Sequence, residues 1–419
     1  MADAVESPLA RPVSRPAGFS LMAASMLAIM AAAAVPTPLY VVYQDDWGFS
    51  SVTLTLIYGV YVIPLLIALL TVGGVSDYIG RRKVLVVSYS ILALSMVAFI
   101  LADSVEGLMI ARLLQGLATG SAMGAVASGL LDLAPLRRPN LGPLLNSIGP
   151  TIGLATGAAV SGLLVQLAPA PTTTIFAVVG VIFVVLAIWA WFLPETKIAR
   201  PGALASLRPR LGVPKPARRT FFVVVPAIVA SAGLGGFYNA IAPSVAADVL
   251  HQDNHFVAGL AVTTLQVTAT ISALVGVRIL TTRHMVVAGS FGIVAGAGLV
   301  IVSMPAHSIV LFFLGTAFAG FGYGVQYLGA VRTVAPLSPL GQRAELFSTL
   351  NVVNYLSMSI PAVLAGALIH QIGLMAAGAT YMAAMMTLAV VAAILKPPVA
   401  PVPASSAAAA TAHMIPSDG

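Results

Sequence analysis

The sequence predicts an all-α integral membrane protein with twelve transmembrane helices, and the prediction rests on hydropathy and on the distribution of charge. Of the 419 residues, 59% are hydrophobic and only 8% are charged, and the mean hydropathy is +1.00. Soluble domains carry about 25% charged residues, so a soluble protein of this composition could not cover its surface. The composition therefore indicates a polytopic membrane protein.

The individual spans follow from long charge-free blocks that short polar or Pro/Gly segments interrupt. A bilayer core requires about 20 apolar residues per helix. On this basis we expect spans at residues 19–43, 54–75, 84–103, 107–133, 141–167, 172–193, 221–248, 256–280, 284–304, 307–331, 344–370 and 374–395.

The charges support this arrangement of spans. Lys and Arg gather in cytoplasmic loops, so two cytoplasmic termini would place them at both chain ends and in every second loop. Of the 20 Lys and Arg residues, 17 fall there, whereas the predicted external loops contain acids such as Asp45, Asp46 and Asp248. We therefore expect a multi-pass protein of the cytoplasmic (inner) membrane with both termini in the cytoplasm. The net charge of +7 then requires no nucleic-acid partner.

A basic, Pro-rich segment divides the spans into two sets of six. In the first set Pro36 is followed by Asp46 and Phe49, and in the second set Pro243, Asp253 and Phe256 repeat that spacing. Two six-helix halves with the substrate held between them are a recurring transporter design. The predicted organisation is an N-terminal cytoplasmic tail (1–18), an N-terminal six-helix bundle (19–193), a cytoplasmic central loop (194–220), a C-terminal six-helix bundle (221–395) and a disordered cytoplasmic tail (396–419).

The stretch GGVSDYIGRRKVL (73–85) concentrates charge between two apolar spans. Gly80 permits a tight turn, Gly73 lets a neighbouring helix approach closely, and Arg81 lies four residues after Asp77, within reach of it. Lys83 and its neighbours also orient the spans.

This stretch resembles the loop signature between spans two and three of the major facilitator superfamily, Gly-x-x-x-Asp-x-x-Gly-Arg-Arg/Lys. The matching residues are Gly73, Asp77, Gly80, Arg81 and Arg82. The resemblance implies the fold of that family. It also implies that the acid–base cluster latches the two halves on the cytoplasmic side, with Asp132 as a further partner of Arg81. The alternative is that the bases serve the topology alone.

Two further motifs resemble the same family. ARLLQGLATG (111–120) is similar to its fourth-span motif through Arg112, Gln115 and Gly116. GPTIG (149–153) resembles part of the fifth-span motif of its proton antiporters, and this resemblance implies export. The matching residues are Gly149, Pro150 and Gly153, whereas Leu145 and Leu154 depart from the motif. The alternative for this segment is an ordinary proline bend with glycines that permit close packing.

Arg112 is the ionisable residue that falls deepest in a predicted span, and such residues are costly and commonly functional. Its guanidinium can meet an anionic substrate group or be neutralised within the protein, and the family resemblance links it to proton coupling. No Asp, Glu or His falls clearly at mid-membrane depth, and the nearest acid is Asp46, beside Asp45. We therefore take Arg112, Gln115 and Asp46 as candidate coupling or substrate residues.

Polar and aromatic side chains mark the spans that are expected to face a central cavity, whereas spans three, six, nine and twelve are expected to face lipid. Each of these side chains could equally bond a neighbouring helix. The candidate cavity residues are Tyr40, Tyr58, Tyr61, Gln115, Asn146, Tyr238, Asn239, Gln266, Gln326, Tyr327, Asn351, Asn354 and Tyr355.

The predicted function is secondary active transport of a small organic molecule by alternating access, as proton-coupled efflux by an antiporter. A proton-coupled importer, a facilitator and a non-transporting sensor on the same fold remain alternatives. The sequence contains neither His-Glu-x-x-His nor two paired acidic motifs, so a membrane enzyme is not expected, and neither is a cofactor or metal. The expected partners are the substrate, protons and the lipid bilayer, and we expect a monomer.

Overall fold

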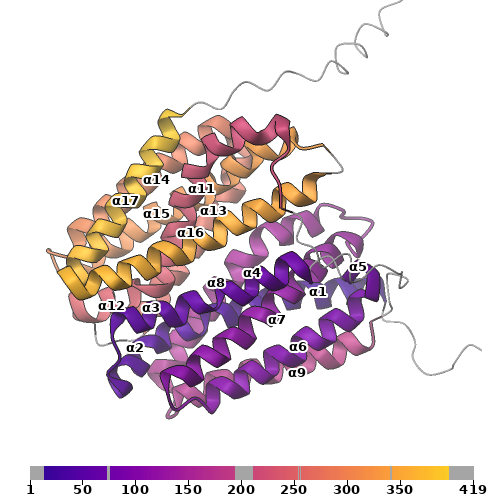
Figure 1. Cartoon of the computed structure of the whole chain (residues 1–419), viewed down its shortest axis with the longest axis horizontal. Helices are drawn as coiled ribbons and strands as arrows, with labels where there is room; N and C mark the ends of the chain where they lie inside the picture. Colours follow the sequence, from indigo (N-terminus) through magenta and orange to yellow (C-terminus); the bar gives the residue numbers. More distant parts are fainter. Residues whose placement is uncertain are drawn as a thin grey trace, which may run out of the picture.

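The computed structural model describes residues 14–72, 76–193, 211–252, 254, 256–339 and 342–395, and these residues form a bundle of α-helices without strands (Figure 1). The predicted tail at 396–419, most of the central loop and Gly73 lie outside the described residues, as do the side chains of Ser76 and Asp77.

The first half of the chain forms six membrane-spanning segments, two of which are each made of two helices. Its helices are α1 (Arg15–Ala34), α2 (Pro36–Trp47), α3 (Ser51–Val60), α4 (Val62–Thr71), α5 (Ser76–Ile79), α6 (Arg81–Ile100), α7 (Val105–Asp132), α8 (Leu141–Leu167) and α9 (Pro171–Trp191). The second half repeats this pattern. Its elements are η1 (Lys215–Ala217), α11 (Arg218–Ala240), α12 (Ala242–Ser244), η2 (Val245–Val249), α13 (Phe256–Ile279), α14 (Thr282–Ser303), α15 (Ile309–Val334), η3 (Ala335–Leu337), α16 (Arg343–Ile372) and α17 (Leu374–Ile394).

Eleven helical segments of the described residues are long and apolar enough to cross a membrane, and each coincides with a predicted span. The remaining predicted span, 107–133, is α7. This helix has 28 residues, a length of about 42 Å, and it packs against α4 and α6. Its polar residues, among them Glu106, Arg112 and Gln115, set it apart from the strictly apolar spans. The predicted all-α membrane fold is confirmed.

Prolines divide the first span of each half at related positions. The break between α1 and α2 falls at Val35, directly before Pro36, and α11 ends at Ala240, shortly before Pro243. Proline has no backbone N–H, so it leaves a carbonyl of the preceding turn without its helical partner. In each half the proline therefore frees a carbonyl of the preceding turn from its bond within the helix.

The two halves contact each other through α8 with α13, α3 and α4 with α16, and α2 with α12 and α13. We call the end of the bundle that holds the junction of α2 and α3 the Asp45 end, and the end where α6 begins the Arg81 end. Figure 1 shows α2, α3 and α12 together at one end and α5 at the other. Close approach needs glycine at the seam, where an added Cβ on Gly162 would lie 3.2 Å from the Cα of Gly259.

Candidate functional site

The buried guanidinium of Arg112 on α7 is the centre of the candidate site. The side chain is 1% exposed. Its Nε donates to the hydroxyl of Tyr40 at 2.8 Å, and its Nη2 donates to the same hydroxyl. Its Nη1 donates to Gln115 Oε1 at 2.7 Å and to the carbonyl of Ala33 at 3.3 Å. The predicted pair Arg112 and Gln115 is thus brought together with Tyr40.

The broken first span supplies the backbone acceptors of this site. Pro36 cannot donate to the carbonyl of Ala32, and Gln115 Nε2 donates to that carbonyl at 2.8 Å instead. The carbonyl of Val35, at the break itself, accepts from Ser161 on α8 at 2.6 Å. The proline break therefore converts helix carbonyls into ligands for side chains of α7 and α8.

Aromatic rings surround the guanidinium. Its central carbon lies 5.4 Å from the ring centre of Tyr40, 5.5 Å from that of Tyr61 and 5.8 Å from that of Phe99. Rings at this distance attract a cation through their quadrupoles. Gly116 brings α7 close to α4, because an added Cβ there would collide with the carbonyl of Tyr61. The glycine of the ARLLQGLATG motif thus places Arg112 beside Tyr61.

No carboxylate neutralises Arg112 within the described part of the chain. Its hydrogen-bond partners are a phenol, an amide and a backbone carbonyl, all of them neutral, and no carboxylate oxygen described there lies within 4.0 Å of its nitrogens. A buried charge without a counterion carries a large desolvation cost. The site therefore carries a positive charge that none of the described residues neutralises.

Tyrosines of the second half approach the same region. Tyr58 is close enough to interact electrostatically with Tyr40 and Arg112 in its own half and with Tyr323 on α15. Tyr355 on α16 packs against the cluster that contains Tyr61. Neither Tyr323 nor Tyr381 was among the predicted residues.

Tyr381 lies on α17, the helix of the twelfth span. It is buried, and its hydroxyl donates to the carbonyl of Gly233 at 2.7 Å. This face of the twelfth span therefore packs against α11, whereas the expectation that the span borders lipid stays a prediction. Tyr381 is the single aromatic residue of this helix, and that was the available signal. Tyr323 could have been found from its place in GFGYGVQY, one turn before Tyr327.

Several predicted cavity residues bond neighbouring groups. Tyr238 donates to Thr316 Oγ1 at 2.9 Å, and Gln326 accepts from Ser231 at 2.9 Å and donates to Ser290 at 2.6 Å. These contacts join helices of the second half, as the alternative interpretation allowed. Among the other candidates, Asn146 donates to the carbonyl of Ala127 at 2.9 Å and Asn239 donates to that of Gly235 at 2.7 Å. Asn354 Nδ2 lies 3.9 Å from Met358 Sδ. Tyr327 and Tyr355 are half-buried.

The span-five motif packs α8 on α1. An added Cβ on Gly149 would lie 2.7 Å from Met26 Cγ, and one on Gly153 would lie 2.5 Å from Met30 Cβ. Pro150 lies inside α8, which nevertheless continues over 27 residues. Both glycines therefore allow α8 to pack closely against α1.

The signature loop forms an ion pair at the Arg81 end. Arg81 Nη1 lies 2.6 Å from Asp132 Oδ2 at the end of α7, as the sequence predicted. Gly80 has a φ of +100°, which favours glycine. Arg82 stacks over the ring of Trp191 on α9 at 5.2 Å. The side chain of Asp77 lies outside the description, so its place beside Arg81 stays a prediction.

Acidic residues mark the opposite end. Asp46 is exposed near the end of α2, six residues or about 9 Å along the helix from Tyr40, and the structure does not bring it to Arg112. Asp248 lies in η2, beyond the membrane-spanning helix α11. Burial and then the charge of Asp45 raise the pKa of Asp248 above its ordinary value of 3.8. This acid of the second half therefore faces an acid of the first.

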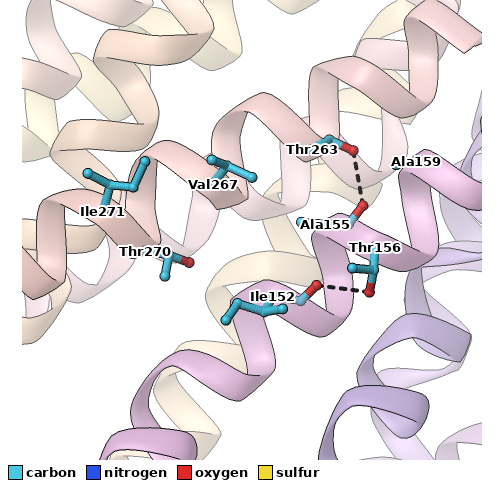
Figure 2. A pocket seen from close by; sticks show the side chains of 8 residues that line it. All are labelled: Ile152, Ala155, Thr156, Ala159, Thr263, Val267, Thr270 and Ile271. Carbon is cyan, nitrogen blue, oxygen red and sulfur yellow. Dashed lines mark hydrogen bonds between the residues drawn. The ribbon is translucent and has the colours of Figure 1, made fainter.

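A pocket of about 240 Å³ lies in the seam between α8 and α13, away from Arg112. Figure 2 shows its lining and the hydrogen bond from Thr263 to the carbonyl of Ala155, which is 3.0 Å long. Among the described residues no group of three or more His, Cys, Asp or Glu is placed to hold a metal ion.

The family follows from comparison with known proteins. A model described as "Major Facilitator Superfamily" matches residues 21–303, more than half of the chain. The chain belongs to the major facilitator superfamily. Its relatives are transporters rather than enzymes.

Two curated relatives match a limited stretch of this superfamily member. A gallate transporter of Pseudomonas putida is 30% identical over 122 residues, covering 29% of this chain and 27% of that protein. The 4-hydroxybenzoate transporter PcaK of Pseudomonas aeruginosa is 30% identical over 123 residues, covering 29% and 28% respectively. The matched stretch is thus little more than a quarter of either relative.

Solved structures share the fold over nearly the whole chain. The nucleoside transporter NupG has a TM-score of 0.69 at 14% identity and covers 90% of this chain and 98% of its own. A bacterial homologue of the human lysosomal transporter Spinster has a TM-score of 0.70 at 13% identity, with 91% and 95% covered. The human organic anion transporter MFSD10 has a TM-score of 0.62 at 15% identity, with 92% and 100% covered. At these identities the likeness concerns the fold alone.

Proposed function

We propose that this protein is a secondary transporter that moves a small aromatic carboxylate across the cytoplasmic membrane by alternating access, coupled to protons. Arg112 binds the carboxylate. The observation that carries the proposal is a fully buried guanidinium whose described partners are all neutral. As in any secondary carrier, the net direction follows the combined gradients of substrate and protons. Export, which the resemblance of the span-five motif implies, stays a prediction.

The energetics of a buried cation support an anionic substrate. A guanidinium has five N–H donors, and the four hydrogen bonds of Arg112 leave one for a further acceptor. An arriving carboxylate would supply this acceptor and the missing negative charge, and charge-assisted bonds of this kind are about twice as strong as neutral ones. Binding of the carboxylate therefore offsets the desolvation cost of the buried guanidinium.

The aromatic surroundings support a substrate with a ring. Tyr58, Tyr323 and Tyr355 come from both halves and lie within electrostatic reach of one another. Aromatic pairs gain about 0.5–1.5 kcal/mol beyond area burial, so a benzene ring fits such surroundings. The names of the two relatives contain gallate and 4-hydroxybenzoate, and both compounds are benzoates with ring hydroxyls.

The proposal also assigns the Arg81 end to one side of the membrane and gives its ion pair a role in closing the carrier. We place the Arg81 end in the cytoplasm because Lys and Arg gather there. Arg81 and Asp132 both belong to the first half, and their ion pair shapes the surface against which the second half closes. Asp132 is 48% exposed, which leaves it accessible to that partner.

Uptake in reconstituted vesicles tests the proposal. Purified protein in proteoliposomes with an imposed pH gradient is given radiolabelled 4-hydroxybenzoate, gallate or, as a neutral comparison, uridine. Arg112→Gln should abolish benzoate uptake, because the amide cannot neutralise a carboxylate. Arg283→Gln, at an exposed position at the start of α14, serves as the control. Equal benzoate uptake by Arg112→Gln and the parent would refute the assignment, and uptake of uridine alone would refute the substrate class.

A further inference from the structure

Gln266 on α13 is a buried amide that has no hydrogen-bond partner in the structure. It is 0% exposed, and neither its Nε2 nor its Oε1 has a partner among the described residues. The other two fully buried glutamines differ. Gln115 donates to Ala32 and accepts from Arg112, and Gln326 bonds Ser231 and Ser290.

An unsatisfied buried amide is costly. A donor or acceptor left without a partner bears the full cost of its desolvation, and native proteins keep few such groups. Leucine, which has a similar volume, would avoid that cost in this helix. The amide of Gln266 therefore needs a partner that the described residues do not supply.

The neighbours of Gln266 on α13 show that it lies beside the seam between the halves. Thr263 and Thr270, at i−3 and i+4 on the same face, bond the first half: Thr263 bonds the carbonyl of Ala155, and Thr270 lies 2.6 Å from Thr151 Oγ1. Leu265, the residue before Gln266, lies against Gly320 of α15. At 100° per residue, Gln266 therefore sits between the face toward α8 and the face toward α15.

Beyond Thr263 and Thr270, the next face of α13 is apolar and exposed. Val267 and Ile271 are 43% and 56% exposed, and with Ile152 and Ala155 they line the groove in Figure 2. On the helical wheel these two residues lie 100–140° from Gln266. The exposed residues of the groove therefore lie on a different side of α13 from Gln266, which is fully buried between the faces toward α8 and α15.

We propose that Gln266 is the hydrogen-bonding subsite of the second half and that it binds a ring hydroxyl of the substrate. This inference rests on the proposed function, in which Arg112 of the first half holds the carboxylate. A phenolic hydroxyl both donates and accepts, and the amide offers one matching acceptor and one matching donor. A substrate that joins Arg112 to Gln266 spans the two halves, so the hydroxyl distinguishes a hydroxybenzoate from plain benzoate.

Competition measurements test this subsite. In proteoliposomes, uptake of radiolabelled 4-hydroxybenzoate is inhibited by unlabelled benzoate or unlabelled 4-hydroxybenzoate, and the ratio of their inhibition constants is the readout. We expect the parent to favour the hydroxylated acid about tenfold, the discrimination that one paired hydrogen bond gives when its loss leaves a buried group unpaired. Gln266→Leu should bring the ratio close to one, mainly by weaker binding of 4-hydroxybenzoate.

A second readout keeps the test independent of folding. Gln266→Leu removes an unpaired amide, so its substrate-free thermal midpoint should equal or exceed that of the parent. Gln326→Leu, the matched control, breaks two hydrogen bonds and should lower the midpoint while keeping the benzoate ratio. Gln266→Met is the second variant should leucine disturb packing. An unchanged ratio in both Gln266 variants would overturn this inference alone, whereas a parent that binds neither benzoate would overturn the proposed function and this inference with it.

Discussion

Gly153→Ala tests whether the span-five motif serves helix packing or proton antiport. Gly153 on α8 faces α1, where an added Cβ would lie 2.5 Å from Met30 Cβ and 2.8 Å from the carbonyl oxygen of Leu27. Ordinary van der Waals contact begins at 3.4 Å. The two helices must therefore separate by roughly 0.6–0.9 Å, because one of the two obstacles is backbone and cannot rotate away.

The expected cost follows from that displacement. Overpacking of this kind costs about 1–3 kcal/mol, against a gain of up to about 1 kcal/mol for replacing glycine by alanine in a helix. Gly298→Ala on α14 is the matched control, since nothing lies within 4 Å of its added Cβ. The control keeps the helix gain without the clash, so the difference between the two variants isolates the packing contribution.

The assay is thermal unfolding of both variants in detergent at one fixed heating rate, because membrane proteins of this size commonly unfold irreversibly. We expect Gly153→Ala to melt several degrees below Gly298→Ala. Uptake of 4-hydroxybenzoate should also fall, since α1 carries the carbonyls of Ala32 and Ala33 that hold Gln115 and Arg112. A Gly153→Ala protein that melts with the control yet loses its dependence on the pH gradient would refute packing and favour the antiporter interpretation.

Two further predictions concern the ends of the bundle. Arg81→Ala should sharply reduce transport while the protein still inserts in the membrane, because Asp132 loses the cation that it pairs with. The double exchange Arg81→Asp with Asp132→Arg should restore part of the transport rate. Failure of the exchange to restore transport would argue against the ion pair. The raised pKa of Asp248 means that the contact with the first half is favoured while Asp248 is protonated and weakens as pH rises through that pKa. The chain has no cysteine, so a single cysteine at Ala246, a position 2% exposed, can be labelled with maleimide. Its labelling rate in Ala246→Cys should rise with pH, and adding Asp248→Asn should remove most of that rise. An equal rise with and without Asp248→Asn would contradict the link to Asp248.

The fold could be predicted from sequence because the bilayer imposes simple rules. Each span needs a long apolar run, and the bases gather on one side. The α7 helix was found in the same way although Arg112 and Gln115 make it less apolar, because the adjacent loops fixed where a span had to lie. The Arg81–Asp132 pair was expected because the resemblance of the loop to the family signature implied it.

The composition of the site was only partly predictable, because hydropathy says nothing about the direction of a side chain within a bundle. Gln115, Gln266 and Gln326 look alike in sequence, yet two bond neighbouring groups and one has no partner. Tyr381 was missed because the sequence of an apolar helix does not show which of its faces points into the bundle. Partners contributed by other helices decide these cases, and a single sequence does not specify them.

The neutral surroundings of Arg112 follow from the proline break and determine how the carrier can use its charge. A carboxylate beside Arg112 would neutralise it permanently and would compete with any anionic substrate. Pro36 instead frees a backbone carbonyl that Gln115 uses, and Gln115, Tyr40 and Ala33 hold the guanidinium through dipoles. Dipoles stabilise the cation but cannot cancel its net charge, so the empty site keeps a charge in the low-dielectric interior. In the proposed function an anionic substrate removes that charge, so we expect the loaded carrier to cross between its two states more readily than the unloaded one.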